Sequence, residues 1–232
     1  MEIIAEIGQN HNGDMKLAKK LITKAKLMGA DTVKFQVYNA KKLFQKKNNP
    51  WFEYNCKTEL NFEQIEILFE ECQKKNIEFM ASVFDEEKVE WLEKIGVRRY
   101  KIASRSIFEN DLIKKIIKTK KPLIVSLGFW KKKTLPSIFK SSKVTFLHCI
   151  SEYPTELKKI KFSKISFKQI CGFSDHTVGT SASKIALSRG AKIIEKHFTL
   201  SHKLFGPDHL CSMTPEELRE ISKFRDDLRK CL

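Results

Sequence analysis

Two lysines that interrupt apolar segments are the first residues in this sequence to suggest chemistry. Lys34 lies in Val-Lys-Phe-Gln-Val, and Lys101 lies in Tyr-Lys-Ile. A charged group within an apolar strand is costly to bury unless it is paired or used. Serines also stand at the ends of apolar segments, namely Ser82, Ser104, Ser126 and Ser174. Converging lysines and hydroxyls bind phosphate and carboxylate. We therefore expect an anion site, the alternative being lysines that extend to the surface.

Two histidines near the carboxyl end suggest a metal site. His176 and His197 follow the last two apolar segments, and Glu6 lies in the first. Two imidazoles with a nearby carboxylate suit a divalent first-row cation that keeps open coordination positions. The alternative is a pair of structural, hydrogen-bonded histidines.

The elements that would position these residues alternate between strands and helices. Apolar segments predict strands at 3–7, 32–37, 77–83, 98–103, 122–127, 143–149, 169–173 and 191–196. Amphipathic segments predict helices at 15–28, 61–75, 85–94 and 109–119, near 134–140, at 180–189 and from Thr214 onward. The stretch 38–61 is expected to be a long loop.

Eight such units predict an α/β fold, a (β/α)8 TIM barrel that forms a single domain over residues 1–232. An open doubly wound sheet is the alternative, although the chain has no GxGxxG fingerprint. In a barrel the carboxyl ends of the strands build the active site. The lysines, serines, histidines and Glu6 would therefore meet at one mouth.

The charge balance raises the question of a nucleic-acid partner. The 232 residues contain 44 Lys and Arg against 28 Asp and Glu, a formal net charge of +16. Only 7 of the 44 are arginine, the residue best suited to phosphate and base contacts. We expect a solvated lysine surface and no nucleic-acid partner. No signal peptide or apolar run predicts export or a membrane span, and the six cysteines form no CxxC pair, so we expect a cytoplasmic protein.

Seven groups of residues resemble the N-acetylneuraminate (sialic acid) synthase family, in the family's order. They are Ala5–Gly8 with His11–Gly13, Gly29–Asp31 with Val33–Gln36, Tyr100–Ser104, Leu147–Cys149 with Tyr153–Thr155, Gly172–Thr177, Glu195–Thr199, and Gly206–Asp208 with Cys211–Met213. The resemblance runs from residue 3 to about residue 225 and implies a barrel enzyme. Such an enzyme condenses phosphoenolpyruvate with an open-chain N-acylated hexosamine, typically N-acetylmannosamine, and releases phosphate with the help of Mn²⁺ or Mg²⁺.

The resemblance also implies roles for individual residues. His176 and His197 would hold the metal, while Lys34, Lys101, Ser104 and Ser174 would bind phosphoenolpyruvate. The sugar or a metal-bound water would face Glu6, Gln36, Tyr153 and Asp208. Glu6 is a candidate to orient or deprotonate the water. Further candidates for substrate binding are Ser82, Ser126, Ser151, Asp175 and Glu195.

The sequence departs from the family in two places. Ser106 stands where many relatives carry an acid, and the adjacent Arg105 is a candidate for an additional anion contact. Typical members form a homodimer whose antifreeze-like domain covers the partner's site, but this sequence stops at Leu232. We expect a homodimer. For the sugar side of the site there are three alternatives: a separate chain supplies the cap, the enzyme uses a different acceptor, or the enzyme works with an open site. The alternatives are a related phosphoenolpyruvate–aldose synthase, for example one with a phosphorylated acceptor, and a non-catalytic barrel subunit that binds sugar or a partner chain.

Overall fold

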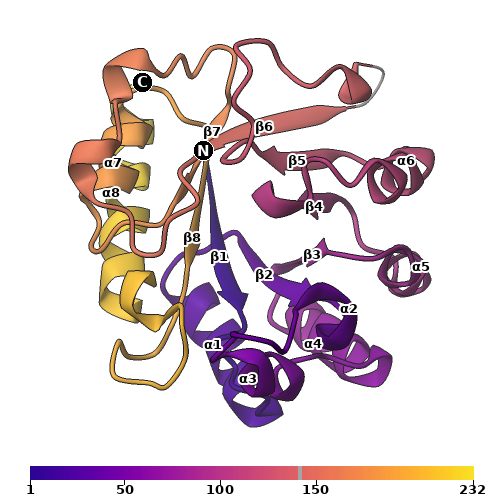
Figure 1. Cartoon of the computed structure of the whole chain (residues 1–232). Helices are drawn as coiled ribbons and strands as arrows, with labels where there is room; N and C mark the ends of the chain where they lie inside the picture. Colours follow the sequence, from indigo (N-terminus) through magenta and orange to yellow (C-terminus); the bar gives the residue numbers. More distant parts are fainter. Residues whose placement is uncertain (141–142) are drawn as a thin grey trace.

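Eight parallel strands close into a barrel in the order of the chain (Figure 1). The computed structural model describes residues 1–140 and 143–232. The strands are β1 (Glu2–Gly8), β2 (Thr32–Val37), β3 (Glu78–Val83), β4 (Tyr100–Ile102), β5 (Leu123–Ser126), β6 (Val144–Cys149), β7 (Gly172–Asp175) and β8 (Ile193–His197). The predicted (β/α)8 architecture is confirmed, and the strand ends differ from the predicted ones by up to three residues.

Six α-helices cover the outside of the barrel, with α5 and α6 on one side and α7 and α8 on the other (Figure 1). They are α1 (Met15–Leu27), α4 (Phe62–Lys74), α5 (Glu86–Ile95), α6 (Asn110–Lys118), α7 (Ser181–Ser188) and α8 (Pro215–Cys231). Asn61 and Thr214 each close a capping box, and Pro215 occupies the first helical position of α8. None of the described helices is long and apolar enough to cross a membrane.

Two predicted connections are wrong. The expected loop at 38–61 contains two short helices, α2 (Ala40–Leu43) and α3 (Phe52–Lys57). The expected helix near 134–140 is only a 3-10 turn at Ser137–Phe139. Pro136 precedes this turn, and in the interior of the predicted helix it would remove a backbone hydrogen bond and clash with the preceding turn. Short 3-10 turns at Leu157–Lys159 and Phe162–Lys164 also stand in place of a helix between β6 and β7.

Strand alternation divides the barrel interior into an apolar layer and a polar layer. The apolar layer consists of Ile4, Met80, Ile124, Leu147 and Ile193. Two residues further along each of these strands lies the next inward position, nearer the carboxyl ends. Those positions hold Glu6, Ser82, Ser126, Cys149 and Glu195, and Lys34, Lys101 and Ser174 join them from β2, β4 and β7. The outward positions pack against the helices. The barrel interior therefore contains an apolar layer and, nearer the carboxyl ends of the strands, a buried polar layer.

Candidate active site

The two lysines predicted for an anion site lie in this polar layer and are only 2% exposed. Lys34 Nζ donates to Ser82 Oγ at 2.8 Å and lies 2.7 Å from Glu6 Oε2. Lys101 Nζ donates to Ser126 Oγ at 2.8 Å and lies 3.4 Å from Glu195 Oε1. Each ammonium group is thus held between a strand-end hydroxyl and a carboxylate. The register explains these contacts, because Glu6 pairs directly with Lys34. Each serine lies two residues beyond the partner of its lysine on the next strand, where Lys34 pairs with Met80 and Lys101 with Ile124.

Glu195 links the two lysines. Its Oε1 accepts a hydrogen bond from Ser174 Oγ at 3.0 Å, and its Oε2 lies 3.7 Å from Lys34 Nζ. Burial opposes ionisation, but Lys101 and Lys34 outweigh it and hold the pKa of Glu195 well below its usual range. Burial likewise opposes the charge on Lys34, but Glu195 and Glu6 raise the pKa of Lys34 above its ordinary value. For Lys101 burial prevails, and its pKa is lowered.

The two histidines stand beside this layer, with ring centroids 6.0 Å apart. His176 Nδ1 is 2.7 Å from the carbonyl oxygen of Ile150, and the ring of Tyr153 packs 4.1 Å from the His176 ring, centroid to centroid. Burial lowers the pKa of His176 to about 4, and the neighbouring His197 adds to the effect. His197 Nδ1 is buried with no hydrogen-bond partner among the described residues, and Asp208 Oδ2 lies 3.8 Å from it.

These histidines fit a divalent cation with open positions. Hydrogen bonding of His176 Nδ1 to a backbone carbonyl orients the ring, as outer partners of metal ligands do, and directs Nε2 towards Ser174 Oγ, 3.5 Å away. The lowered pKa keeps this imidazole neutral, which is the form that binds a metal. Over residues 1–140 and 143–232, no group of three or more His, Cys, Asp or Glu is arranged to hold a metal ion. The donor set therefore suits a site that water or substrate completes.

Two connected cavities open above the polar layer. The lower one has a volume of about 50 Å³ and contains both lysines and both histidines. The upper one, about 440 Å³, is bounded by aromatic side chains and by Arg105 and Asp208. Four predicted residues line both cavities: Gln36, Ser104, Tyr153 and His197. A small ligand in the lower cavity would thus face a larger one in the upper cavity.

Two glycines leave room for this arrangement. Gly8 has φ +54° at an irregularity in the pairing of β1 with β2, and its Cβ would stand 3.3 Å from Gln36 Nε2 and Glu6 Oε1. At Gly128, after β5, a Cβ would lie 2.3 Å from Ser151 Oγ and 2.6 Å from Ser104 Oγ. Glycine at position 128 therefore lets the ends of β4, β5 and β6 come together beside the cavities.

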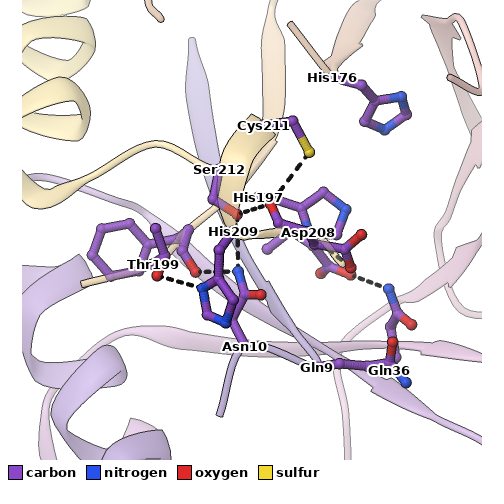
Figure 2. Close-up of polar contacts among 12 residues, drawn as sticks. Gln9, Asn10, Gln36, His176, His197, Thr199, Asp208, His209, Cys211 and Ser212 are labelled. Carbon is purple, nitrogen blue, oxygen red and sulfur yellow. Dashed lines mark hydrogen bonds and ion pairs between the residues drawn. The ribbon is translucent and has the colours of Figure 1, made fainter. Parts of the chain in front are cut away.

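Asp208 reaches the upper cavity on the loop between β8 and α8 (Figure 2). Ser212 Oγ donates to the Asp208 carbonyl at 2.7 Å and accepts from Asn10 Nδ2 at 2.9 Å. His209 Nδ1 is 2.7 Å from Thr199 Oγ1. Figure 2 shows the side chains of Asp208 and His197 next to each other, with these contacts beside them. The network fastens the loop to the segment after β1 and so fixes the position of Asp208.

The structure places Asp175 outside the cavities. Ser174 points inward, so Asp175 points outward towards α7, where it is fully buried. Asp175 Oδ2 accepts from Ser183 Oγ at 2.6 Å and lies 3.3 Å from Lys196 Nζ. The expectation that Asp175 contacts substrate is therefore not met by this geometry. The side chain instead supports the turn that carries His176.

The family relationship follows from comparison with known proteins. The family model described as the NeuB family matches residues 21–232. The chain belongs to the NeuB family. The predicted resemblance is thereby confirmed, because sialic acid synthases are among the NeuB relatives and solved structures that match this chain.

Individual NeuB relatives agree with this assignment. The N,N'-diacetyllegionaminic acid synthase of Legionella pneumophila is 36% identical over 247 residues, which cover 94% of this chain and 69% of that protein. An uncharacterized protein of Methanocaldococcus jannaschii is 39% identical over 233 residues, covering 94% and 68%. The crystal structure of the N-acetylneuraminic acid (sialic acid) synthetase of Leptospira borgpetersenii, in complex with citrate, superposes with a TM-score of 0.90 at 34% identity, over 99% of this chain and 84% of that one. The prediction of a sugar-acid synthase is confirmed at this level.

The predicted site residues of this NeuB protein meet at the barrel mouth, with Asp175 as the exception. The lower cavity is lined by Glu6, Lys34, Gln36, Ser82, Lys101, Ser104, Ser126, Tyr153, Ser174, His176, Glu195 and His197, and Ser151 and Asp208 line the upper one. Sequence reasoning missed Cys149 below and Gln9, Phe44, Phe84 and Phe129 above. The apolar neighbours of Cys149 in the sequence suggest a core residue. Cys149 follows Leu147 by two residues on the inward face of β6, and this spacing was the sequence signal that it faces the cavity.

Proposed function

We propose that this NeuB protein, acting as a single barrel domain, condenses phosphoenolpyruvate with an open-chain N-acylated hexosamine and releases phosphate. One observation carries the proposal. Two buried lysines, each bonded to a strand-end serine, lie in a small cavity that adjoins two histidines and opens into a larger chamber. The small cavity suits the compact dianionic partner, and the chamber suits a sugar.

The charges of the lower cavity support a ligand with both carboxylate and phosphate groups. Lys34 and Lys101 provide two ammonium groups, and the serines provide hydroxyl donors that complete an anion site. The Leptospira synthetase is likewise in complex with a multiply charged anion, citrate. Glu6 and Glu195 balance the two lysines, so the cavity has no surplus positive charge of its own. A bound anion would therefore need further positive charge nearby, and a divalent cation at the adjacent histidines would supply it.

His176 and His197 would hold that cation, for which we propose Mn²⁺ or Mg²⁺. When bound, it would polarise the sugar aldehyde as a Lewis acid. The rings are already oriented for this role, because His176 is fixed by the Ile150 carbonyl and by the packed ring of Tyr153. Asp208, beside His197, is placed to accept a hydrogen bond from a water or a sugar hydroxyl at the same position.

The remaining residues support the bond changes of the reaction. The double bond of phosphoenolpyruvate supplies the electron pair that joins carbon 3 to the aldehyde carbon, and the aldehyde oxygen takes up a proton to become a hydroxyl. Water adds at carbon 2 with loss of a proton. The bond from carbon 2 to the phosphate oxygen then breaks, and the carbon 2 hydroxyl gives its proton to the departing phosphate and becomes a carbonyl. Lys34 and Lys101 hold the carboxylate and phosphate through these steps, and Ser104 and Ser174 contribute hydroxyls. Glu6, held at Oε1 by Gln36 at 3.1 Å, orients the water and takes its proton at Oε2.

The experiment that tests this function measures phosphoenolpyruvate consumption with Mn²⁺ and a panel of N-acylated hexoses. We expect turnover with at least one acceptor. His176→Ala and His197→Ala should each abolish turnover and reduce Mn²⁺ affinity, measured by titration calorimetry. His148→Ala is the matched control, because the ring of His148 stacks on Phe173 and lies outside both cavities. Absence of turnover with every acceptor, or full activity of both variants, would overturn the proposal.

A further inference from the structure

Arg105 lies in the 3-10 turn Ser104–Ser106 that follows β4, at the rim of the upper cavity. Its guanidinium carbon stands 5.2 Å from the ring centroid of Phe44 and 5.9 Å from that of Phe84. Arginine stacks on aromatic faces and is held in place by them. One further contact orients it, since Nη2 donates to the carbonyl of Leu43 at 3.3 Å.

Most N–H donors of this guanidinium group are not used by the contact with Leu43. Arginine offers five N–H groups in a planar fork that matches carboxylate and phosphate. Within the described part of the chain, no carboxylate lies within 4.0 Å of Arg105, whereas Arg99, Arg225 and Arg229 are each ion-paired. Among the described residues that line the upper cavity, Arg105 is the only one with a permanent positive charge. An anion entering this chamber would therefore meet Arg105.

The position of Arg105 relative to the lower cavity indicates which ligand it serves. Its neighbour Ser104 lines both cavities, whereas Arg105 lines only the upper one. The reacting end of a sugar must face the lower cavity and His197, which leaves the other end in the chamber with Arg105. Phe44, Phe84 and Phe129 supply apolar walls for the carbon chain between the two ends.

We propose that Arg105 binds an anionic group, a phosphate or a carboxylate, at the end of the acceptor remote from its aldehyde. The preferred acceptor of this enzyme is then an anionic N-acylated hexosamine. This inference rests on the proposed function and adds the chemical class of the acceptor. Arg105 is a specificity-determining residue here, because it contacts the substrate away from the reacting atoms.

The test compares a neutral N-acylated hexosamine with its 6-phosphate and its 6-carboxylate, measured by consumption of phosphoenolpyruvate. We expect an anionic acceptor to have a KM at least about tenfold lower than the neutral one, from one charge-assisted contact. Arg105→Gln should raise the KM for the anionic acceptor about tenfold or more and leave kcat within about threefold. The KM for the neutral sugar should stay within about twofold. Arg105→Lys should retain part of the preference, and the better of the two anions identifies the group.

Arg98→Gln is the matched control, because Arg98 is an exposed arginine at the opposite end of the same strand. It should change neither KM. If Arg105→Gln raises the KM for neutral and anionic sugars equally, Arg105 only tethers α2 through Leu43 and the inference is overturned. The same holds if the wild-type enzyme uses the neutral sugar as well as the anionic ones, and the proposed function then still stands. If no acceptor is consumed, the proposed function fails. Calorimetry then tests the anion site alone: it exists if the wild type binds the 6-phosphate or the 6-carboxylate more tightly than Arg105→Gln does, and it does not exist if the two proteins bind them equally.

Discussion

The buried pair formed by Asp175 and Lys196 allows a sharp test of how the site is built. Both side chains are fully buried, 3.3 Å apart, on the outer face of β7 and β8. Asp175 Oδ1 also accepts from the Thr177 amide and hydroxyl, both at 2.8 Å, and Lys196 donates to the Thr177 carbonyl. His176 lies between the two residues that this cluster holds, and His197 directly follows Lys196. We therefore predict that Asp175→Asn destabilises the fold.

The size of the loss follows from the geometry. The substitution removes the negative charge and leaves the Lys196 ammonium buried, with an amide group facing it and the Ser183 hydroxyl. Removing one partner of a buried ion pair costs about 3–5 kcal/mol of unfolding free energy. For a chain of this size, about 1 kcal/mol corresponds to about 2–4 °C in Tm, so Tm should fall by roughly 6–20 °C.

Thermal unfolding by circular dichroism, with urea denaturation at 25 °C, measures the loss. Asp111→Asn is the matched control, since Asp111 and Lys114 are 84% and 64% exposed and their pair contributes less than about 1 kcal/mol. The reasoning is refuted if Asp175→Asn unfolds within about 1 kcal/mol of the wild type. A stable variant whose KM for phosphoenolpyruvate rises more than about tenfold would show instead that Asp175 contacts substrate.

Four further predictions concern the cavity and the segment after β1. Gly128→Ala should lower the unfolding free energy by about 1–3 kcal/mol through overpacking, measured by urea denaturation, and should raise the KM for phosphoenolpyruvate. Unchanged values of both quantities would contradict the close approach of Ser151 and Ser104 to this residue. Lys101→Met should weaken phosphoenolpyruvate binding at least about tenfold by calorimetry, and unaltered affinity would remove Lys101 from the anion site. Glu6→Gln should lower kcat about 100-fold or more, whereas full turnover would exclude Glu6 as the base. Burial lowers the pKa of His11 from 6.5 to about 4, so between these pH values the unfolded state binds more protons and His11 makes the unfolding free energy rise with pH by up to about 1.4 kcal/mol per unit. His176 adds a similar slope, so in urea titrations at pH 5, 6 and 7 His11→Asn should reduce the total slope only by the share of one histidine, and an unchanged slope would show that His11 does not contribute.

The barrel and its polar layer were predictable because both depend on short-range pattern. Apolar strands with a period of two place Lys34 and Gln36 on the same face of one strand, and Glu195 and His197 on the same face of another strand. A lysine in such a strand stands out against its apolar neighbours. Strand ends that converge on one mouth then bring these residues together without further information.

Residues outside the strand pattern were not predictable in this way. Phe44 and Phe84 reach the upper cavity from connecting segments, where no periodicity indicates the direction of a side chain. The sequence pattern ends the seventh strand at residue 173, which leaves Asp175 in a loop facing the cavity. The actual strand continues to Asp175, and alternation then directs the carboxylate outward.

The central claim is that the lysine-lined cavity binds phosphoenolpyruvate for attack on a sugar and for loss of phosphate by carbon–oxygen cleavage. The most direct measurement uses phosphoenolpyruvate that carries heavy oxygen at the bridge between carbon 2 and phosphorus, with Mn²⁺ and the N-acylated hexosamine that supports turnover. Mass spectrometry of the products then locates the label. The account predicts all of the label in the released phosphate. Label retained at carbon 2 of the sugar acid, or unreacted phosphoenolpyruvate with every acceptor, would contradict it.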